Sequence, residues 1–282
     1  MSTLFKIMAL CDKIKSGKFI ITSEIAPPKG TDVEEVMKDA DLVNGRVDAI
    51  NVTDLQSSVM RTGSLAVCKL LIERGLEPVF QITCRDRNRL ALQSDLLSAA
   101  VFGIQNVLAL TGDHPSLGDH PSAKPVFDLD SMQLLEAIRD LQAGKDMAGK
   151  ELRGSPKFCG GAVVNPGADP IEPEIIKMEK KINAGAQFFQ TQAIYEMHLF
   201  EKFLKASSHL KTTIIAGIVL LKSAGMARYM NKNVAGVFVP EELIHEMEQT
   251  KDKSAKSIEI AARLIRELKP ICQGVHIMPI GW

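Results

Sequence analysis

Short apolar runs alternate along the chain with longer segments in which apolar residues recur every three or four positions. The short runs predict strands over residues 19–25, 48–53, 78–83, 106–111, 157–164, 187–193, 212–219 and 274–280. Most of them are almost continuously apolar, as in parallel strands that are buried on both faces. The segments between them predict helices near 32–43, 62–74, 87–102, 130–143, 171–184, 197–208, 222–232 and 253–268, with an additional turn or helix at 240–250.

Eight strands separated by helices, with no Pro/Ser-rich linker or block of charge between them, predict one (β/α)8 barrel. About 250 residues is typical of that fold. A doubly wound open sheet is the alternative, but a glycine-rich phosphate loop usually follows its first strand. Here that strand is followed by Ala26-Pro27-Pro28. The order of the elements alone does not separate the two folds, and we favour the barrel.

The predicted domain is a single barrel over residues 1–282, with residues 1–17 as a helical N-terminal extension. No helical pattern follows the eighth predicted strand, so the barrel lacks the helix that would cover it. We therefore expect the segment 3–14, or a partner protein, to pack on the outer face of that strand.

The composition excludes several other classes of protein. Hydrophobic residues make up 45% of the chain and charged residues 24%, as in ordinary globular proteins. Because 34 Lys and Arg balance 34 Asp and Glu, we expect neither nucleic acid nor a membrane surface as a partner. No apolar run is long enough to span a membrane, and no signal peptide is recognisable, which indicates a cytoplasmic protein. The cysteines lie far apart and never in a CxxC spacing, which argues against a disulfide scaffold and a thiolate zinc site: Cys11, Cys68, Cys84, Cys159 and Cys272.

Polar residues end most of the predicted strands. In barrel enzymes the catalytic groups lie at the C-terminal ends of the strands and in the loops that follow. Polar strand ends also arise simply because loops begin there, so the pattern alone carries limited weight. The groups that converge on this rim are Thr22-Ser23-Glu24, Asn51 to Asp54, Gln81 to Asp86, Thr111-Gly112-Asp113, Asn165-Pro166, Gln190-Thr191-Gln192 and Lys222-Ser223.

Two carboxylates of this rim are candidates for catalysis. Glu24 has apolar neighbours and no cation before Lys29. Such surroundings disfavour the charged form of a carboxyl group and suit it to general acid catalysis near neutral pH. Asp113 follows Gly112, which allows the backbone to approach a ligand closely. The alternatives are a solvent-facing glutamate and a turn-forming aspartate.

Two further patterns suggest other chemistry but do not fit it. The pair Asp113-His114 recurs as Asp119-His120, but the surrounding Pro and Gly residues indicate successive turns, so we expect no metal site. Residues 144–150 match most of a phosphate-binding P-loop. They follow a helix instead of a strand, and Glu151 stands where Ser or Thr would hold magnesium.

Six motifs in register with the predicted strands resemble those of the methylenetetrahydrofolate reductases, specifically the short bacterial form: TSEIAPPKG, INVTD, QITCRD, LALTGD, GAVVNPGADP and EKKINAGAQFFQTQ. The resemblance runs from about Lys18 to Trp282. The variants VVNPGADP and LLKSAGMARYMNKNVAGVFVPEEL are most similar to the reductases of acetogenic and other one-carbon anaerobes. This similarity implies a role in acetogenesis or methionine biosynthesis.

The resemblance implies a flavin-bearing enzyme that reduces 5,10-methylenetetrahydrofolate to 5-methyltetrahydrofolate. It implies that Glu24 protonates the folate as its five-membered ring opens, and that Asp113 lies beside the flavin and the pterin. Gln192 matches an amide that touches folate and the nicotinamide donor. The positions that match flavin-binding residues of the family are Thr53, Gln81, Leu110, Thr111, Gly112, Asp113, Phe127, Asp128, Asn165, Asp169, Glu174, Lys177, Lys180 and Lys181, the last two facing the phosphates.

Three positions depart from the pattern of the family. Gln81 replaces a histidine and Asn165 a tyrosine of many relatives, so FAD is expected but FMN stays open. Ala224 replaces a phenylalanine that stacks on the nicotinamide in the enterobacterial type, so the electron donor can be NAD(P)H, reduced ferredoxin or a partner subunit. The chain also ends at IMPIGW, where relatives continue. We expect an oligomer.

Two other functions stay open at this point. One is a non-catalytic or electron-accepting barrel subunit of a larger electron-transfer complex, against which the presence of both Glu24 and Asp113 weighs. The other is a pterin-binding methyltransferase barrel, which would hold no flavin.

Overall fold

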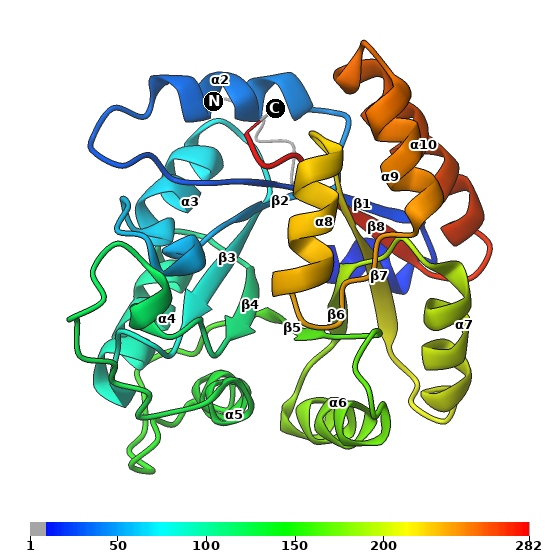
Figure 1. Cartoon of the computed structure of the whole chain (residues 1–282). Coiled ribbons are helices and arrows are strands. Elements are labelled where there is room, and N and C mark those ends of the chain that lie inside the picture. Colours follow the sequence, from blue (N-terminus) through cyan, green and yellow to red (C-terminus); the bar gives the residue numbers. More distant parts are fainter. Residues whose placement is uncertain (1–9, 282) are drawn as a thin grey trace.

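Eight parallel strands close into a barrel in the computed structural model, which describes residues 10–281 (Figure 1). Each strand pairs with its neighbours in the sequence, and β1 pairs with β8 to close the ring. The predicted barrel is confirmed, and the alternative of an open sheet is wrong. The strands are β1 (Ile20–Ile25), β2 (Ala49–Val52), β3 (Pro78–Thr83), β4 (Asn106–Leu110), β5 (Cys159–Val164), β6 (Phe188–Ala193), β7 (Thr213–Val219) and β8 (Gly274–Met278).

Helices surround the strands, as the periodicity predicts (Figure 1). Three helices lie between β7 and β8, and the predicted extra element at 240–250 is one of them. The helices are α1 (Leu10–Lys15), α2 (Glu34–Val43), α3 (Ser64–Glu73), α4 (Arg89–Val101), α5 (Ser131–Gln142), α6 (Glu172–Ala184), α7 (Met197–Ala206), α8 (Ala224–Asn233), α9 (Glu241–Gln249) and α10 (Lys253–Leu268), with the 3-10 turns η1 (Gln56–Ser58) and η2 (Pro115–Leu117).

Side-chain caps fix where two of the helices around the mouth begin. The Asn88 side chain accepts hydrogen bonds from the backbone N–H groups of Leu90 and Ala91 at the start of α4, both at 3.1 Å. Asp130 caps α5 and completes a capping box with Gln133. Because such caps satisfy donors that a helix leaves unpaired, the loops after β3 and β4 end at defined positions.

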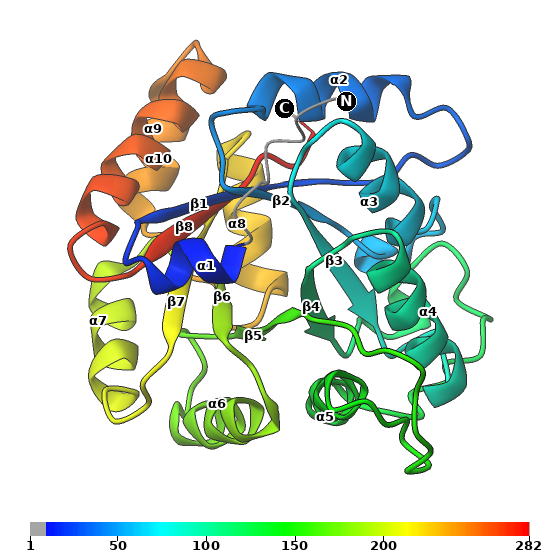
Figure 2. The ribbon, with the colours of Figure 1, turned by 180° about the vertical axis from the view of Figure 1, so that it is seen from behind.

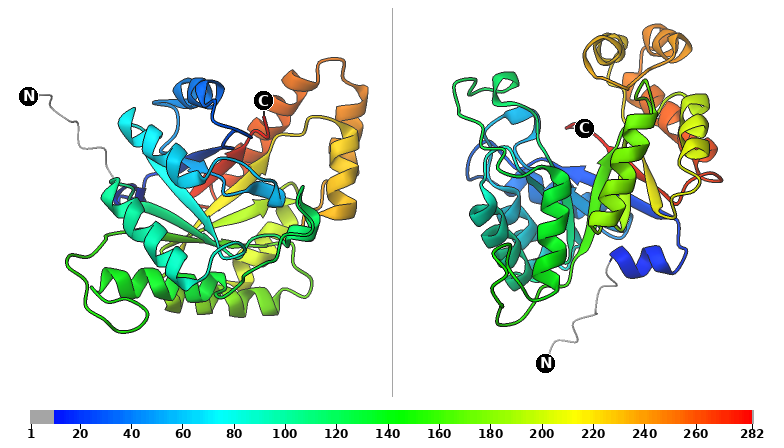
Figure 3. Two further views of the ribbon diagram at one scale, coloured as in Figure 1. Left: turned by 90° about the vertical axis from the view of Figure 1, so that its left-hand side faces the viewer. Right: turned by 90° about the horizontal axis from the view of Figure 1, so that it is seen from below.

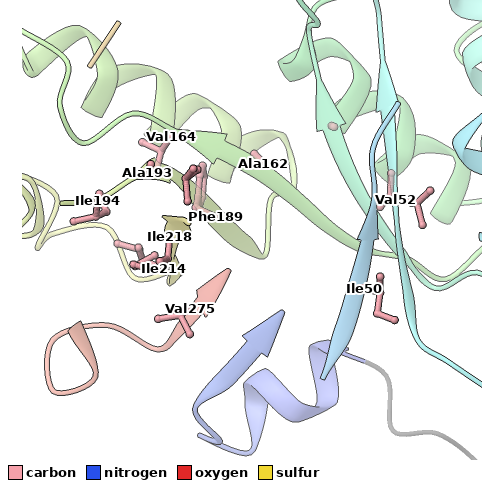
Figure 4. Packing of buried hydrophobic residues seen from close by; sticks show 14 of the residues in the cluster. Ile50, Val52, Ala162, Val164, Phe189, Ala193, Ile194, Ile214, Ile218 and Val275 are labelled. Atoms are coloured by element: carbon pink, nitrogen blue, oxygen red, sulfur yellow. The ribbon is translucent and has the colours of Figure 1, made fainter. Parts of the chain in front are cut away.

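Two hydrophobic clusters form the core. The larger lies between the strands and the helices, and Figure 4 shows members of it on β2, β5, β6, β7 and β8. The smaller gathers apolar side chains from the N-terminal halves of the strands, namely Ile20, Ala49, Val79, Leu108, Cys159, Phe188 and Ile215, together with Leu10. A Cβ at Gly161 would lie 2.2 Å from the Phe188 ring, so glycine at this position is what admits that ring to the barrel interior.

The helix α1 closes the N-terminal end of the barrel. Leu10 is fully buried in the smaller cluster, and Figure 2 shows α1 lying across the strands on the side opposite to α8. Figure 3 shows the two helices at opposite ends of the barrel. The prediction that the segment 3–14 covers the outer face of β8 is therefore wrong for residues 10–14, because burying Leu10 in the base removes more apolar surface from water. Residues 3–9 lie outside the described residues.

The described chain ends soon after β8 and contains no helix beyond it. On the outer face of β8, Val275 is fully buried in the larger cluster, to which Leu264 and Leu268 of α10 also belong. Ile277 is only half-buried. This face is therefore buried at Val275 and partly exposed at Ile277.

A disulfide joins Cys11 of α1 to Cys159 at the start of β5. The sequence argues against a disulfide scaffold and does not anticipate this single disulfide. The two cysteines are 148 residues apart, and only the docking of α1 at the base brings them together. The cysteines Cys68, Cys84 and Cys272 are buried and free. Within residues 10–281, no helix has the length and apolar character needed to cross a membrane.

Candidate active site

The interior of the barrel changes from apolar to polar toward the C-terminal ends of the strands. Alternate residues of a strand point to the same side, so Ile20, Thr22 and Glu24 of β1 share one face. The same change occurs along β2, β6 and β8. Above the apolar base lies a buried polar layer of Thr22, Asn51, Gln190 and His276.

Glu24 lies above this layer at the mouth of the barrel. Its side chain is 10% exposed, and its Oε2 lies 3.5 Å from Nε2 of His276, which is 4% exposed. The sequence correctly indicates a largely enclosed carboxyl group. Its neighbours are not only apolar, however, because the imidazole of β8 faces it. His276 is a site residue that the sequence analysis missed.

A continuous set of hydrogen bonds extends from His276 across the barrel. His276 Nδ1 lies 2.9 Å from the Thr22 hydroxyl, to which the Gln190 amide donates at 3.3 Å. Gln190 and Asn51 form a reciprocal amide pair at 2.7 and 3.1 Å. Buried polar groups are stable when they are paired in this way, so the layer is a rigid floor beneath Glu24.

Thr53 follows β2 at the same level as Glu24. It is 3% exposed, and its hydroxyl oxygen has no hydrogen-bond partner among the residues that the structure describes. A buried polar atom without a partner is costly in a protein. The Thr53 hydroxyl is therefore available to a ligand, as the resemblance to the family implies.

Asp54 follows Thr53 but serves the scaffold. Its Oδ2 accepts hydrogen bonds from the backbone N–H and hydroxyl of Thr83, each at 2.8 Å. Its two oxygens also accept from Arg87, at 2.8 and 3.2 Å. The carboxylate beside Arg87 raises the pKa of that guanidinium, against the effect of burial. Asp54 thereby ties the ends of β2 and β3 to the loop before α4.

The residues after β4 form a second side of the mouth. Asp113 is exposed, and its carboxylate makes no hydrogen bond or ion pair within residues 10–281. Gly112 has φ +91°, and a Cβ there would press on Thr83 and Arg85 at 3.1 Å. Arg85, 2% exposed, donates to the Asp113 backbone carbonyl at 3.3 Å. Arg85 thus fixes the backbone of this loop, while the Asp113 carboxylate remains available to bind a ligand.

Other predicted flavin positions near this loop differ in exposure. Gln81 is buried on β3, Leu110 is half-buried at the end of β4, and Thr111 is exposed. Asp128 is held by Arg89, whose Nε and Nη2 donate to it at 2.9 Å. These hydrogen bonds lower the pKa of Asp128 to about 2. Phe127 has φ +40° and stacks against His114 with ring centres 6.4 Å apart.

The loop after β5 contacts the segment that follows α8. Asn165 donates through Nδ2 to the Ala235 carbonyl at 3.1 Å, and its backbone N–H donates to Glu174 at 2.9 Å. A Cβ at Gly236 would lie 2.2 Å from Asn165 Nδ2. Asn165 and Glu174 therefore hold this side of the mouth together. Asp169 is exposed beside them.

The three predicted lysines of α6 have different surroundings. Lys177 is exposed and lies 3.8 Å from Glu174. Lys181 is buried and donates to the Val163 carbonyl at 2.7 Å, and burial lowers its pKa. Lys180 lines a surface groove with Asp130 and Glu136, between α5 and α6. The structure does not bring Lys180 to the mouth with the other predicted residues.

Gln192 is exposed near the end of β6, two positions beyond Gln190. The residues that the structure does bring to the C-terminal ends of the strands are Glu24, Thr53, Gln81, Thr111, Gly112, Asp113, Asn165 and Gln192. A signal for the missed His276 exists in the sequence, because it is a polar residue at an inward position of an otherwise apolar strand.

Comparisons with known proteins give a consistent result. The family model described as methylenetetrahydrofolate reductase matches residues 9–280. "Methylenetetrahydrofolate reductase 2" of Schizosaccharomyces pombe is 28% identical, over 96% of this chain and 44% of that protein. The "5,10-methylenetetrahydrofolate reductase" of Pectobacterium carotovorum is 25% identical, over 72% of this chain and 64% of that protein. The chain thus spans less than two thirds of either relative.

Among solved structures, an uncharacterized protein from Clostridium thermocellum that binds two copies of 5-methyl-5,6,7,8-tetrahydrofolic acid has a TM-score of 0.65. It is 20% identical, and the match covers 95% of this chain and 91% of that chain. A 2,3-dimethylmalate lyase matches with a TM-score of 0.52 at 10% identity. At these identities the likeness establishes the barrel fold alone.

Proposed function

Because the chain belongs to the methylenetetrahydrofolate reductase family, we propose that it reduces 5,10-methylenetetrahydrofolate to 5-methyltetrahydrofolate with the help of a bound flavin. The observation that carries the proposal is the position of Glu24, a largely enclosed carboxyl group at the centre of the mouth. The Clostridium thermocellum protein binds 5-methyl-5,6,7,8-tetrahydrofolic acid, which supports a folate as the ligand of this chain.

The residues at the mouth fit a flavin. The buried Thr53 hydroxyl lacks a partner among the described residues, and Gly112 leaves the backbone after β4 without a side chain. Gln81 and the lysines Lys177 and Lys181 would add donors to the ring system and the phosphates. Lys181 would have to exchange its hydrogen bond with Val163. The flavin, which we expect to be FAD, would supply hydride transfer.

The side chains of the chain supply binding and proton transfer. Glu24 in its acid form donates a proton to a folate nitrogen as the ring of the substrate opens, and becomes a carboxylate. The Asp113 carboxylate, which has no protein partner within the described residues, accepts hydrogen bonds from the N–H groups of the pterin. Gln192 of β6 offers its side-chain amide to the same ligand. Positioned acids of this kind contribute about 10²- to 10⁴-fold to a rate.

The electron donor and the partners belong to the proposal as well. NAD(P)H, reduced ferredoxin and an electron-transfer subunit are the candidate donors, and we propose an oligomer that acts in the cytoplasm. The neutral overall charge means that a protein donor would have to bind through a local charged patch.

The test is an anaerobic half-reaction titration of the flavin-reconstituted protein. NADH, NADPH and reduced ferredoxin are tried in parallel as reductants, and 5,10-methylenetetrahydrofolate is then added as the oxidant. We expect the visible absorbance of the flavin to disappear with at least one donor and to return with the folate. A protein that takes up flavin but is never reoxidised by this folate would refute the proposal.

Glu24→Gln tests the assignment of the acid. We expect it to slow reoxidation by folate about 10²-fold or more and to leave reduction of the flavin intact. Glu77→Gln is the matched control, since Glu77 is a half-buried glutamate just before β3, at the opposite end of the barrel, where it accepts a hydrogen bond from Asn106 at 2.7 Å. Equal folate rates in the two variants would show that Glu24 is not the acid.

A further inference from the structure

The imidazole of His276 occupies a position that the proposed reaction has not yet used. It is buried on β8, with its Nε2 directed at Glu24 and its Nδ1 at Thr22. The strand register sets it beside Thr22 of β1 and Gly217 of β7. Gly217 has no side chain, and a Cβ there would lie 2.4 Å from the Thr191 carbonyl oxygen, so β6 and β7 approach each other closely at this level.

The hydrogen bonds of the polar layer are compatible with a proton on Nε2 of His276. Gln190 donates to the Thr22 oxygen, so the Thr22 hydroxyl is free to donate its own proton to Nδ1 of His276. A neutral imidazole that accepts at Nδ1 carries its proton on Nε2. The Nε2–H group then faces Oε2 of Glu24 at 3.5 Å.

We propose that His276 is a positioning residue for Glu24, and that its Nε2–H stabilises the carboxylate formed when Glu24 gives its proton to the folate. The proposal rests on the proposed function, in which Glu24 is the acid. The O–H bond of Glu24 breaks and an N–H bond of the folate forms, while the ring C–N bond of the folate opens to an iminium. The negative charge then lies on Glu24 and the positive charge on the folate. The 3.5 Å contact shortens into a hydrogen bond in the complex, as catalytic hydrogen bonds commonly do.

The neighbours of this pair in the polar layer carry no charge. Thr22, Asn51 and Gln190 are neutral, and β7 contributes Gly217. Lys222, which follows β7, directs its ammonium group to the Gly281 carbonyl beyond β8, at 3.2 Å. A substitution of His276 should therefore act mainly on the proton transfer from Glu24.

The experiment compares the pH profile of the folate half-reaction in three proteins. His276→Phe removes the donor and should lower the plateau rate about tenfold, the loss of one hydrogen bond to a charged group. It should also move the alkaline decline of the rate about one pH unit upward, because the carboxylate is no longer stabilised. His276→Gln restores an N–H donor and should recover most of the rate and the profile. Flavin reduction should not change in any of them.

Thr22→Val is a second variant that keeps the imidazole in place and removes the donor to Nδ1. In ¹⁵N-histidine NMR spectra, His276 of the unaltered protein should be the neutral Nε2-protonated tautomer, and its signals should respond to Glu24→Gln. Thr22→Val should weaken the preference for this tautomer.

The outcomes separate this inference from the proposed function. A His276→Phe protein with an unchanged rate and pH profile overturns the positioning role, and so does an Nδ1-protonated His276. If the unaltered protein never reduces the folate, the proposed function fails. The NMR result still supports the His276–Glu24 pair if the Nε2 tautomer responds to Glu24→Gln, and overturns it if there is no response.

Discussion

Two aspartates, one after β2 and one after β4, should respond in opposite ways to the same substitution. Asp54 has a side chain with no exposed surface, and both of its oxygens accept from Arg87. In Asp54→Asn, the amide nitrogen would face a guanidinium N–H group whichever way the amide turns. Asp113 is exposed and lacks side-chain partners within residues 10–281.

The magnitude follows from the contacts that Asp54→Asn breaks. Removing one partner of a buried ion pair costs about 3–5 kcal/mol. Arg87 keeps its contact of 2.9 Å with Asp95, so we expect the lower end, about 3 kcal/mol. A chain of this size loses roughly 2–4 °C of Tm per kcal/mol, which gives a fall of about 6–12 °C. Asp113→Asn should change the free energy of unfolding by less than about 0.5 kcal/mol.

The assay is thermal unfolding followed by circular dichroism, together with the folate half-reaction. Asp54→Asn should lower Tm, while Asp113→Asn should keep Tm and lose affinity for folate. An Asp54→Asn protein whose Tm stays within about 2 °C of the unaltered chain would refute the assignment of Asp54 to the scaffold. A destabilised Asp113→Asn protein would refute the assignment of Asp113 to the ligand.

Three further changes test the fold and its electrostatics. Gly161→Ala should destabilise the protein by about 1–3 kcal/mol through overpacking against Phe188. A Cβ at Gly160 would meet its nearest atom at 3.6 Å, so Gly160→Ala should lower the free energy of unfolding less than half as much. Urea titrations measure both. Cys11→Ser should lower stability by about 2–4 kcal/mol without reductant and should match the unaltered protein once dithiothreitol is present, since the disulfide is then open in both. The hydrogen bonds from Arg89 lower the pKa of Asp128 from 3.8 to about 2. The contribution of Asp128 to stability is therefore complete above about pH 4 and is lost as the pH falls toward 2. In urea titrations between pH 5 and pH 2, Asp128→Asn should lose less free energy of unfolding than the unaltered chain.

The sequence predicts the barrel well because its strands are local patterns. Each apolar run and each helical period is contained within a short window, and the (β/α)8 order follows from their alternation. The positions of Glu24 and Asp113 are also local, since both follow directly from strand ends. Contacts between distant segments leave no such local pattern. The sequences around Cys11 and around Cys159 give no indication that these two residues form a disulfide.

The same distinction separates Asp54 and Lys180 from the rest of the candidate site. Asp54 ends a strand like Asp113, and only the position of Arg87 in the fold assigns it to the scaffold. Lys180 and Lys181 are adjacent in the sequence but point to different sides of α6, one to a surface groove and the other to Val163. The face that a helical residue presents depends on how the helix packs.

The base of the barrel explains why the polar layer must satisfy its own hydrogen bonds. Leu10 and the smaller cluster close the N-terminal end with apolar side chains, so polar groups above that base reach water only from the mouth. A buried amide without a partner costs about 1–3 kcal/mol. Asn51 and Gln190 avoid this cost by pairing with each other, and the Gln190 amide also donates a hydrogen bond to the Thr22 hydroxyl. The hydrogen-bonded layer therefore leads through Thr22 to His276 and then to Glu24. These two groups lie at its end nearest the mouth, where a ligand would bind.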